Sequence, residues 1–366
     1  MLLFADSFDH YVTADLTEKW TAVGAYGPAL SPTITAAGRT SNALTWTTAT
    51  TKATNGLALS PAHAPSDSTC IVGFAFKVAS LGDYNFGAYG HTFGIWNGGD
   101  YKCGFKVLNN GTIGFGTSDY SYISSGVPVQ DGRWAYIECK VVLHDSTGSV
   151  VIKVNGTVVL SQTNIDTIYT GTAAWNGIDI QGARTGPTAA DAVLTNSNTV
   201  LYDDFYLLDG SVGTGRANND FLGDISVRYL VPTSDSAVTW DRGGTDSGAN
   251  FSQVSESSPD DDSKYVTTAT VDEIDYYGFP DVTVGADIYG VQAVISAKKA
   301  DTGSAQIAAC VKTSGGSDRE HPSPLGIASD SAYSYFLFPW DGSPETSLAW
   351  TESEVNGAAF GPRKTL

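Results

Sequence analysis

Aromatic and amide side chains gather in one stretch of the sequence, and their types suit the binding of sugars. Aromatic rings stack on the apolar faces of sugar rings, while amides and carboxylates hydrogen-bond the sugar hydroxyl groups. We therefore consider as candidate glycan-binding residues Tyr84, Asn85, Tyr89, Trp96, Asp100 and Tyr101, which lie in or beside one expected loop. The alternative is that Trp96 packs in a sheet core and that the tyrosines only cover loops.

Residues for glycan cleavage are harder to find. Hydrolysis of a glycosidic bond needs two carboxyl groups held about 5–9.5 Å apart. The first 210 residues contain only two glutamates, Glu18 and Glu138, and no strand carries a closely spaced pair. Five scattered histidines match no catalytic triad and no metal-ligand spacing: His10, His63, His91, His144 and His321. From the residues alone we expect no catalytic residues and a protein that is not an enzyme.

The elements that would position these side chains are β-strands. Trp134 to Leu160 predicts three consecutive antiparallel strands, near 134–143, 149–154 and 157–161, because Asn155-Gly156 between apolar runs is a strong hairpin signal. The 366 residues include 40 glycines, and long helical periodicity is missing. This composition is typical of an all-β protein with many turns and very little helix.

The chain divides near residue 210. Glycine, serine and threonine in Gly210–Gly215 predict a flexible connector between domain 1–210 and domain 211–366. After it we expect an irregular strand over Phe221–Val231, then strands near 264–270, 288–299, 304–313 and 331–338. Thr351 and Glu354 form a capping-box pattern that predicts one short helix. The sequence thus predicts two antiparallel β-sandwich domains in series.

Charge and apolar patterning exclude several partners. The formal net charge of −19 repels nucleic acid, so we expect no nucleic-acid binding. No apolar run is long enough for a membrane span, and the first residues lack the pattern of a signal peptide, so we expect synthesis in a cytoplasm and no membrane insertion. Four cysteines lie within apolar strands, which favours free buried thiols: Cys70, Cys103, Cys139 and Cys310.

Short motifs resemble a known fold. Gly132-Arg133-Trp134, followed by strand, turn, strand and Asn155-Gly156, resembles the core of concanavalin A-like, or laminin-G-like, jelly-roll domains. Residues 3–9 and 201–210 are similar to the paired terminal strands of such domains, so the resemblance covers residues 1–210. In that family the tryptophan packs under the sheet. The layout of the whole chain also resembles virion structural proteins of tailed bacteriophages.

The jelly-roll resemblance raises the question of calcium. Laminin-G-like and pentraxin-like domains bind calcium at a loop rim through aspartates and backbone carbonyls, and Asp203 or Asp204 with Asp179 could contribute. Asp203 and Asp204 are adjacent, so in a strand their side chains point to opposite faces. Because the ligand set is incomplete, we treat calcium as an open alternative and expect no other cofactor.

Together these observations lead to one main expectation and two rivals. The phage resemblance implies a non-enzymatic structural protein exposed on the head or tail of a virion assembled in the host cytoplasm. It would act with other virion proteins as a homo-oligomer, and could adhere to a host surface glycan. The first rival is a lectin-like carbohydrate-binding module, and the second is a glycan-cleaving enzyme.

Overall fold

The computed structural model describes residues 1–23, 32–48, 56–82, 90–126, 128–182, 198–212, 218–245 and 247–366. These residues divide into two compact units. The N-terminal unit comprises Ala5–Ser211 and Asn219–Val227, and the C-terminal unit comprises Met1–Phe4, Val212–Asn218 and Arg228–Leu366. Of the expected connector Gly210–Gly215, residues 213–215 lie outside the described ranges. In the described part of the chain, no helix is long and apolar enough to cross a membrane.

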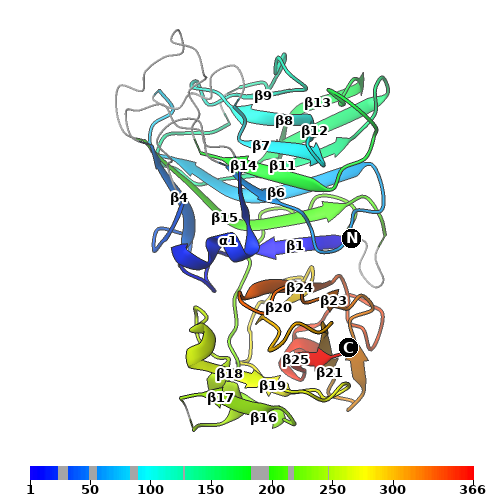
Figure 1. The fold of residues 1–366 in the computed structure, drawn as a ribbon. Coiled ribbons are helices and arrows are strands. Elements are labelled where there is room, and N and C mark those ends of the chain that lie inside the picture. Colours follow the sequence, from blue (N-terminus) through cyan, green and yellow to red (C-terminus); the bar gives the residue numbers. More distant parts are fainter. Residues whose placement is uncertain are drawn as a thin grey trace. The chain divides into compact units, whose positions relative to one another are not determined.

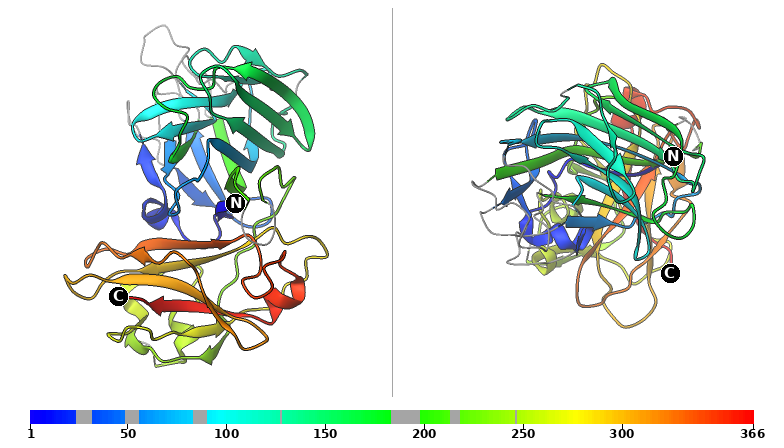
Figure 2. Two further views of the ribbon diagram at one scale, coloured as in Figure 1. Left: turned by 90° about the vertical axis from the view of Figure 1, so that its right-hand side faces the viewer. Right: turned by 90° about the horizontal axis from the view of Figure 1, so that it is seen from above.

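The N-terminal unit is a sandwich of two antiparallel sheets, which can be followed in Figures 1 and 2. The eight-stranded sheet, which we call sheet A, contains seven strands in the order β13 (Thr157–Ile165), β12 (Gly148–Val154), β11 (Ala135–Val142), β6 (Thr69–Val78), β15 (Asn198–Asp209), β4 (Ala43–Thr48) and β3 (Thr33–Thr35). Its eighth strand, β1 (Leu2–Asp6), pairs with β15. The seven-stranded sheet, sheet B, has the order β10 (Tyr122–Ile123), β9 (Ile113–Gly116), β8 (Asp100–Val107), β7 (Phe93–Asn97), β14 (Gly177–Gln181), β5 (Gly56–Leu59) and β2 (Thr21–Val23).

The core lies between sheets A and B and is filled by buried apolar side chains from both. Phe74 of β6 stacks on Phe105 of β8, with ring centroids 6.1 Å apart, and on Phe205 of β15, at 5.8 Å. All three side chains are fully buried. The prediction of an all-β sandwich is therefore confirmed. The four cysteines are also free and buried, as expected.

The predicted meander forms with the expected turn. β11 pairs with β12, and β12 with β13. Asn155 and Gly156 join the last two strands with φ angles of 48° and 78°, which a type I′ turn requires. Trp134 differs from its expected place in the core: it precedes β11, is half-buried, and has the Lys77 ammonium 5.7 Å from its ring centroid.

Only short helices occur among the described residues. In the N-terminal unit the 3-10 turn η1 (Thr13–Asp15) leads into α1 (Leu16–Lys19). In the C-terminal unit η2 (Asn250–Gln253) and η3 (Asp261–Ser263) are single turns, and α2 spans Glu352–Asn356. The Thr351 hydroxyl accepts from the Glu354 amide, and the Glu354 carboxylate accepts from the Thr351 amide at 2.9 Å, so the predicted capping box is confirmed.

The C-terminal unit is also built from antiparallel strands. Its six-stranded sheet contains five strands in the order β16 (Ser234–Ala237), β19 (Tyr276–Gly278), β25 (Ala359–Lys364), β21 (Gln306–Lys312) and β22 (Asp318–Glu320). The sixth strand, β23 (Leu325–Gly326), pairs with β21. Two strand pairs complete it: β17 (Asp241–Gly244) with β18 (Lys264–Thr267), and β20 (Val291–Ala297) with β24 (Ser334–Trp340). Phe338 and Trp340 of β24 pack with Val311 of β21 in one apolar cluster.

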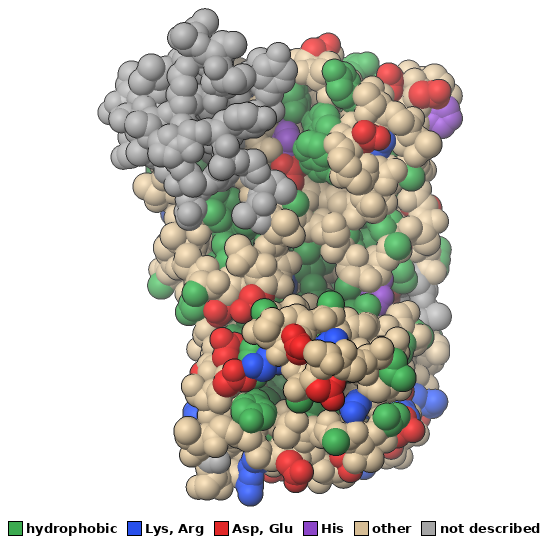
Figure 3. Space-filling model, in the orientation of Figure 1, with side chains coloured by type: hydrophobic (Ala, Val, Ile, Leu, Met, Phe, Trp, Pro, Cys, Tyr) green, Lys and Arg blue, Asp and Glu red, His purple; other side chains and the backbone are tan. Residues whose placement is uncertain are grey.

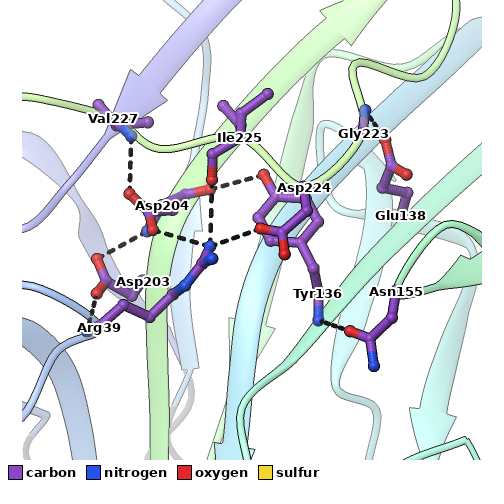
Figure 4. Close-up of polar contacts among 10 residues, drawn as sticks. All are labelled: Arg39, Tyr136, Glu138, Asn155, Asp203, Asp204, Gly223, Asp224, Ile225 and Val227. Atoms are coloured by element: carbon purple, nitrogen blue, oxygen red, sulfur yellow. Dashed lines mark hydrogen bonds and ion pairs between the residues drawn. The ribbon is translucent and has the colours of Figure 1, made fainter. Parts of the chain in front are cut away.

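The expected strand Phe221–Val231 is wrong. Residues 221–233 form no strand, and Asn219–Val227, which we call the crossing segment, lies on the outer face of sheet A. Its amides bind side chains rather than a neighbouring strand: Gly223 donates to Glu138 Oε1 at 2.8 Å, and Val227 donates to Asp204 Oδ1 at 2.7 Å (Figure 4). The apolar residues of the crossing segment therefore pack against sheet A without forming a β-strand.

Acidic and basic side chains are intermingled on the face of the C-terminal unit that Figure 3 draws. They lie there among neutral side chains. This dispersal agrees with an acidic excess that acts as a general solvating charge.

Candidate functional site

The outward face of sheet B carries a cluster of polar and aromatic side chains. Along β14, Ile178 and Ile180 point into the core and are fully buried, so Asp179 between them points outward. On β7 the same alternation places Gly94 and Trp96 on the outward face. We call this cluster the sheet B site; it contains His91, Trp96, Tyr101, Tyr120, Asp179 and Gln181.

A row of glycines forms the floor of the sheet B site. Gly94 is paired with Asp179 on one side and with Gly104 on the other, and Gly104 is paired with Gly116. A Cβ atom on Gly94 would lie 2.5 Å from Asp179 Oδ1 and 2.6 Å from His91 Nε2. On Gly104 it would lie 2.8 Å from the Tyr101 hydroxyl. The missing side chains therefore let the functional groups lie flat against the sheet.

Asp179 is the electrostatic centre of the site. Its Oδ1 atom lies 2.6 Å from His91 Nε2 and accepts from Trp96 Nε1 at 2.6 Å, and its Oδ2 atom accepts from Gln181 Nε2 at 2.8 Å. The side chain is 1% exposed. Burial acts to raise the pKa of Asp179, but His91, Gln181 and Trp96 together hold the pKa below its ordinary value. Asp179 is therefore an ionised carboxylate.

The charge on Asp179 fixes the tautomer of His91. A carboxylate can only accept, so His91 Nε2 carries the hydrogen and donates it to Oδ1. Gln181 Nε2 also lies 2.9 Å from this His91 nitrogen, but a protonated Nε2 has no lone pair to accept with, and Gln181 donates instead to Asp179 Oδ2 at 2.8 Å. In neutral His91 the lone pair is then on Nδ1, and in the part of the chain that the structure describes no hydrogen bond engages Nδ1.

Aromatic rings surround the His91–Asp179 pair. Tyr101 stacks on His91, with centroids 5.3 Å apart and planes 20° apart, and Trp96 meets Tyr101 edge-on at 5.2 Å. The Tyr101 and Tyr120 hydroxyls are 3.0 Å apart. Desolvation raises the pKa of Tyr101 well above its ordinary value, so its hydroxyl stays protonated. Tyr120 adopts a left-handed backbone with φ 50°, uncommon for a bulky residue.

The predicted sugar-binding residues are only partly brought together. Tyr84, Asn85 and Tyr89 lie outside the described residues. Trp96 and Tyr101 are neighbours in the sheet B site, both half-buried. Asp100 begins β8, is exposed, and lies 3.9 Å from the Lys102 ammonium.

The calcium candidates lie on two different sheets. Asp179 is on sheet B, whereas Asp203 and Asp204 are at a β-bulge of β15 in sheet A. Asp203 accepts from the Arg39 amide at 2.7 Å, and Asp204 pairs with the Arg39 guanidinium at 3.1 Å (Figure 4). Burial raises the pKa of Asp203 to about 7, and burial also raises the pKa of Asp204. Among the described residues, no group of three or more potential ligands could hold a metal ion.

Three residues of the sheet B site escaped sequence reasoning: His91, Gln181 and Tyr120. His91 stands alone in the sequence, and its partner Asp179 lies 88 residues away. A usable signal was the glycine at an outward position in each of three successive strands, at Gly94, Gly104 and Gly116. Such a pattern indicates that other side chains occupy the space over the sheet.

Comparisons with known proteins find similar structures but no family. No family model matches the chain, and no curated protein matches it. An alginate lyase from Aplysia kurodai is 13% identical with a TM-score of 0.42, covering 57% of this chain and 99% of its own. A carbohydrate esterase from bacteriophage phi24B is 12% identical with a TM-score of 0.34, covering 56% and 98%. The lectin UEA-II complexed with galactose is 14% identical with a TM-score of 0.35, covering 57% and 98%.

The expectation that the chain is not an enzyme is corrected by these findings. Most of the similar structures are enzymes, chiefly polysaccharide lyases, and one is the esterase. The expectation depended on a missing pair of carboxylates, which is a requirement of glycoside hydrolysis. Elimination and ester cleavage can proceed with another base, so the missing pair does not exclude catalysis.

Proposed function

We propose that the N-terminal unit binds a carbohydrate at the sheet B site. The observation that carries the proposal is the joint presence of half-buried rings, Trp96 and Tyr101, with a buried His91–Asp179 pair on a glycine floor. Rings of this kind stack on the faces of sugars, and fixed polar groups select hydroxyl positions. The outward position of Trp96, opposite to that of the core residues of β7, supports the proposal.

Binding is tested with a glycan array followed by calorimetry on the full chain. The variants are Trp96→Ala, which removes a half-buried ring of the sheet B site, and Trp134→Ala, which removes a half-buried ring outside sheet B and serves as the matched control. We expect Trp96→Ala to weaken binding by roughly five- to a hundredfold, in line with about 1–3 kcal/mol for a ring that stacks on an aromatic side chain. Trp134→Ala should bind as the parent does. If both variants bound the glycan with equal affinity, the binding site could not be the sheet B site.

A specific observation favours catalysis as a second activity of the same site. Asp179 holds His91 in the tautomer that leaves a lone pair on Nδ1, the arrangement by which a buried carboxylate orients a histidine base. A base of this kind can remove the proton next to a uronate carboxyl group, or activate water against an ester. We propose that His91 is this base and that the substrate is a glycan.

Two assays separate the reactions. Elimination from a uronic-acid polymer creates a conjugated double bond that absorbs ultraviolet light, whereas ester cleavage releases acid. His91→Gln should reduce either rate by about a hundredfold or more. His144→Gln is the matched control, because His144 is an exposed histidine on another hairpin. Product formed at equal rates by the parent and His91→Gln would contradict the role of His91.

We also propose a setting for this activity. The resemblance of the chain layout to virion structural proteins supports a place on the head or tail of a phage particle, in a homo-oligomer with other virion proteins. There the sheet B site would meet a glycan of the host surface. Mass spectrometry of purified particles would detect the chain if this is so, and its absence from intact particles would refute the setting.

A further inference from the structure

A second cluster of buried polar side chains lies at the start of the N-terminal unit and has no part in the proposed function. Lys19 Nζ is 3.1 Å from Asp6 Oδ2, and the side chains of both residues are 0% exposed. Lys19 Nζ is also 2.9 Å from His10 Nε2, and His10 Nδ1 lies 4.0 Å from Asp6 Oδ1. One imidazole therefore spans an amine and a carboxyl group that are already in contact.

Local structure brings these groups together. β1 ends at Asp6, and the short η1–α1 turn reverses the chain so that Lys19 returns to it. Phe8 and Trp20 stack at 6.1 Å, and Lys19 lies 5.3 Å from the centroid of Tyr11. The amine and the carboxyl group are thus held in an apolar, aromatic enclosure from which solvent is excluded.

We propose that Lys19 and Asp6 form an intramolecular amide bond. A lysine amine beside a carboxyl group in a dry, fixed geometry has a very high effective concentration, which removes most of the entropic barrier to condensation. The product would tie β1 covalently to α1. An ordinary buried ion pair is the alternative, and such a pair contributes little net stability once desolvation is included.

The condensation balances without any co-reactant. Starting from the neutral pair, Nζ attacks Cγ of Asp6 and forms the carbon–nitrogen bond. The acid proton of the neutral pair is on Oδ1. His10 Nε2 takes a proton from Nζ, and His10 Nδ1 gives its proton to Oδ1, which then carries two protons and leaves as water when its bond to Cγ breaks. Oδ2 becomes the amide oxygen; Tyr11 donates to it at 2.8 Å and Trp20 Nε1 at 3.0 Å, which stabilises the negative charge that develops there.

Protonation states agree with this sequence of steps. Desolvation lowers the pKa of Lys19, which favours the neutral, nucleophilic amine. Desolvation and the Lys19 charge lower the pKa of His10 to about 3, so its imidazole is neutral and Nε2 can accept from Nζ. Burial raises the pKa of Asp6, but the nearby Lys19 and His10 and the donors to its oxygens hold it below its ordinary value. Asp6 therefore rests as a carboxylate beside Lys19, and transfer of one proton from Nζ to the carboxyl group, carried on Oδ1, gives the reactive neutral pair.

Intact mass spectrometry of the purified, denatured full chain tests the proposal directly. We expect a mass lower than the sequence mass by one water, and a branched proteolytic peptide that joins Asp6 to Lys19. Lys19→Arg and Asp6→Ala should each show their full sequence mass. Asp6→Asn should lose ammonia in place of water, because its leaving group is an amine.

The control is the exposed Lys298–Asp262 pair, whose 2.7 Å contact is shorter than that of Lys19 with Asp6. Lys298→Arg should keep the deficit of one water, since contact in solvent does not drive condensation. A parent chain with its full sequence mass after long incubation from about pH 5 to about pH 9 would overturn the proposal. A deficit that persists in Lys19→Arg would also overturn it, because the water would have been lost elsewhere. Both measurements are independent of glycan binding.

Discussion

Replacing Glu138 with alanine should release the crossing segment from sheet A. Glu138 is 1% exposed, and its Oε1 atom accepts from the Tyr206 hydroxyl at 2.6 Å and from the Gly223 amide at 2.8 Å. The Tyr206 hydroxyl also accepts from the Leu222 amide at 3.3 Å. One carboxylate therefore organises two successive amides of the segment.

The expected cost follows from the two bonds that are lost. A hydrogen bond to a charged group contributes about 1.5–3 kcal/mol, so losing both should lower the unfolding free energy of Glu138→Ala by about 3–6 kcal/mol. A domain of about 150–250 residues, the size range of the N-terminal unit, loses about 2–4 °C of melting temperature for each kcal/mol, which predicts a decrease of about 6–24 °C. If the loss falls on the docked segment alone, the Gly223 amide should exchange at least a hundredfold faster, since about 1.4 kcal/mol is tenfold.

Urea unfolding followed by fluorescence gives the free energy, and hydrogen exchange gives the local opening. Asp220→Ala is the control: it removes an ion pair with Lys140 in which Asp220 is 69% exposed, and should cost less than about 1 kcal/mol. A Glu138→Ala protein with unchanged stability and unchanged exchange at Gly223 would refute the argument that this carboxylate holds the segment.

Three further results are expected. Gly94→Ala should abolish glycan binding at the sheet B site, because its Cβ would displace Asp179 and His91; calorimetry with the parent ligand checks this, and retained affinity would contradict the glycine-floor argument. The pKa of Asp203 is about 7 in the folded chain against 3.8 in the unfolded chain, so the folded chain binds this proton more tightly. The contribution of this proton to the unfolding free energy is therefore complete below about pH 3.8 and is lost as the pH rises through about 7. Asp203→Asn should flatten that slope in unfolding free energies measured across this pH window, and an unaltered slope would assign it to other groups. Finally, a fragment of residues 1–227 should melt above a fragment of residues 1–210, because only the longer one contains the crossing segment; equal melting by calorimetry would count against its docking.

Local patterns predicted the first sandwich well. The Asn155-Gly156 turn needs only positive φ at two adjacent positions, so the sequence reveals it without knowledge of the fold. The capping box at Thr351 is equally local. Phe221–Val231 was misassigned because apolar residues on a docked segment resemble those of a strand. What distinguishes them is the partner of each amide, such as Glu138 for Gly223, which lies 85 residues away.

The sheet B site was harder to predict because it depends on register. Trp96 and Tyr101 are close in sequence, and their rings meet edge-on in the structure. His91 meets Asp179 only because β14 pairs with β7 so that Asp179 faces Gly94. A shift of one residue would turn Asp179 into the core, and no short-range signal sets that pairing.

The division of the chain has a consequence for the order of events during synthesis. Met1–Phe4 belongs to the C-terminal unit, where the Leu2 amide donates to Asp341 Oδ1 at 2.6 Å. Asn218 donates to the same oxygen at 2.8 Å. Because Asp341 lies 339 residues after Leu2, this hydrogen bond can form only after Asp341 has been synthesised, so the C-terminal unit closes late. Contacts between residues so far apart in the sequence slow folding, because the long intervening segment must be ordered before the contact can form.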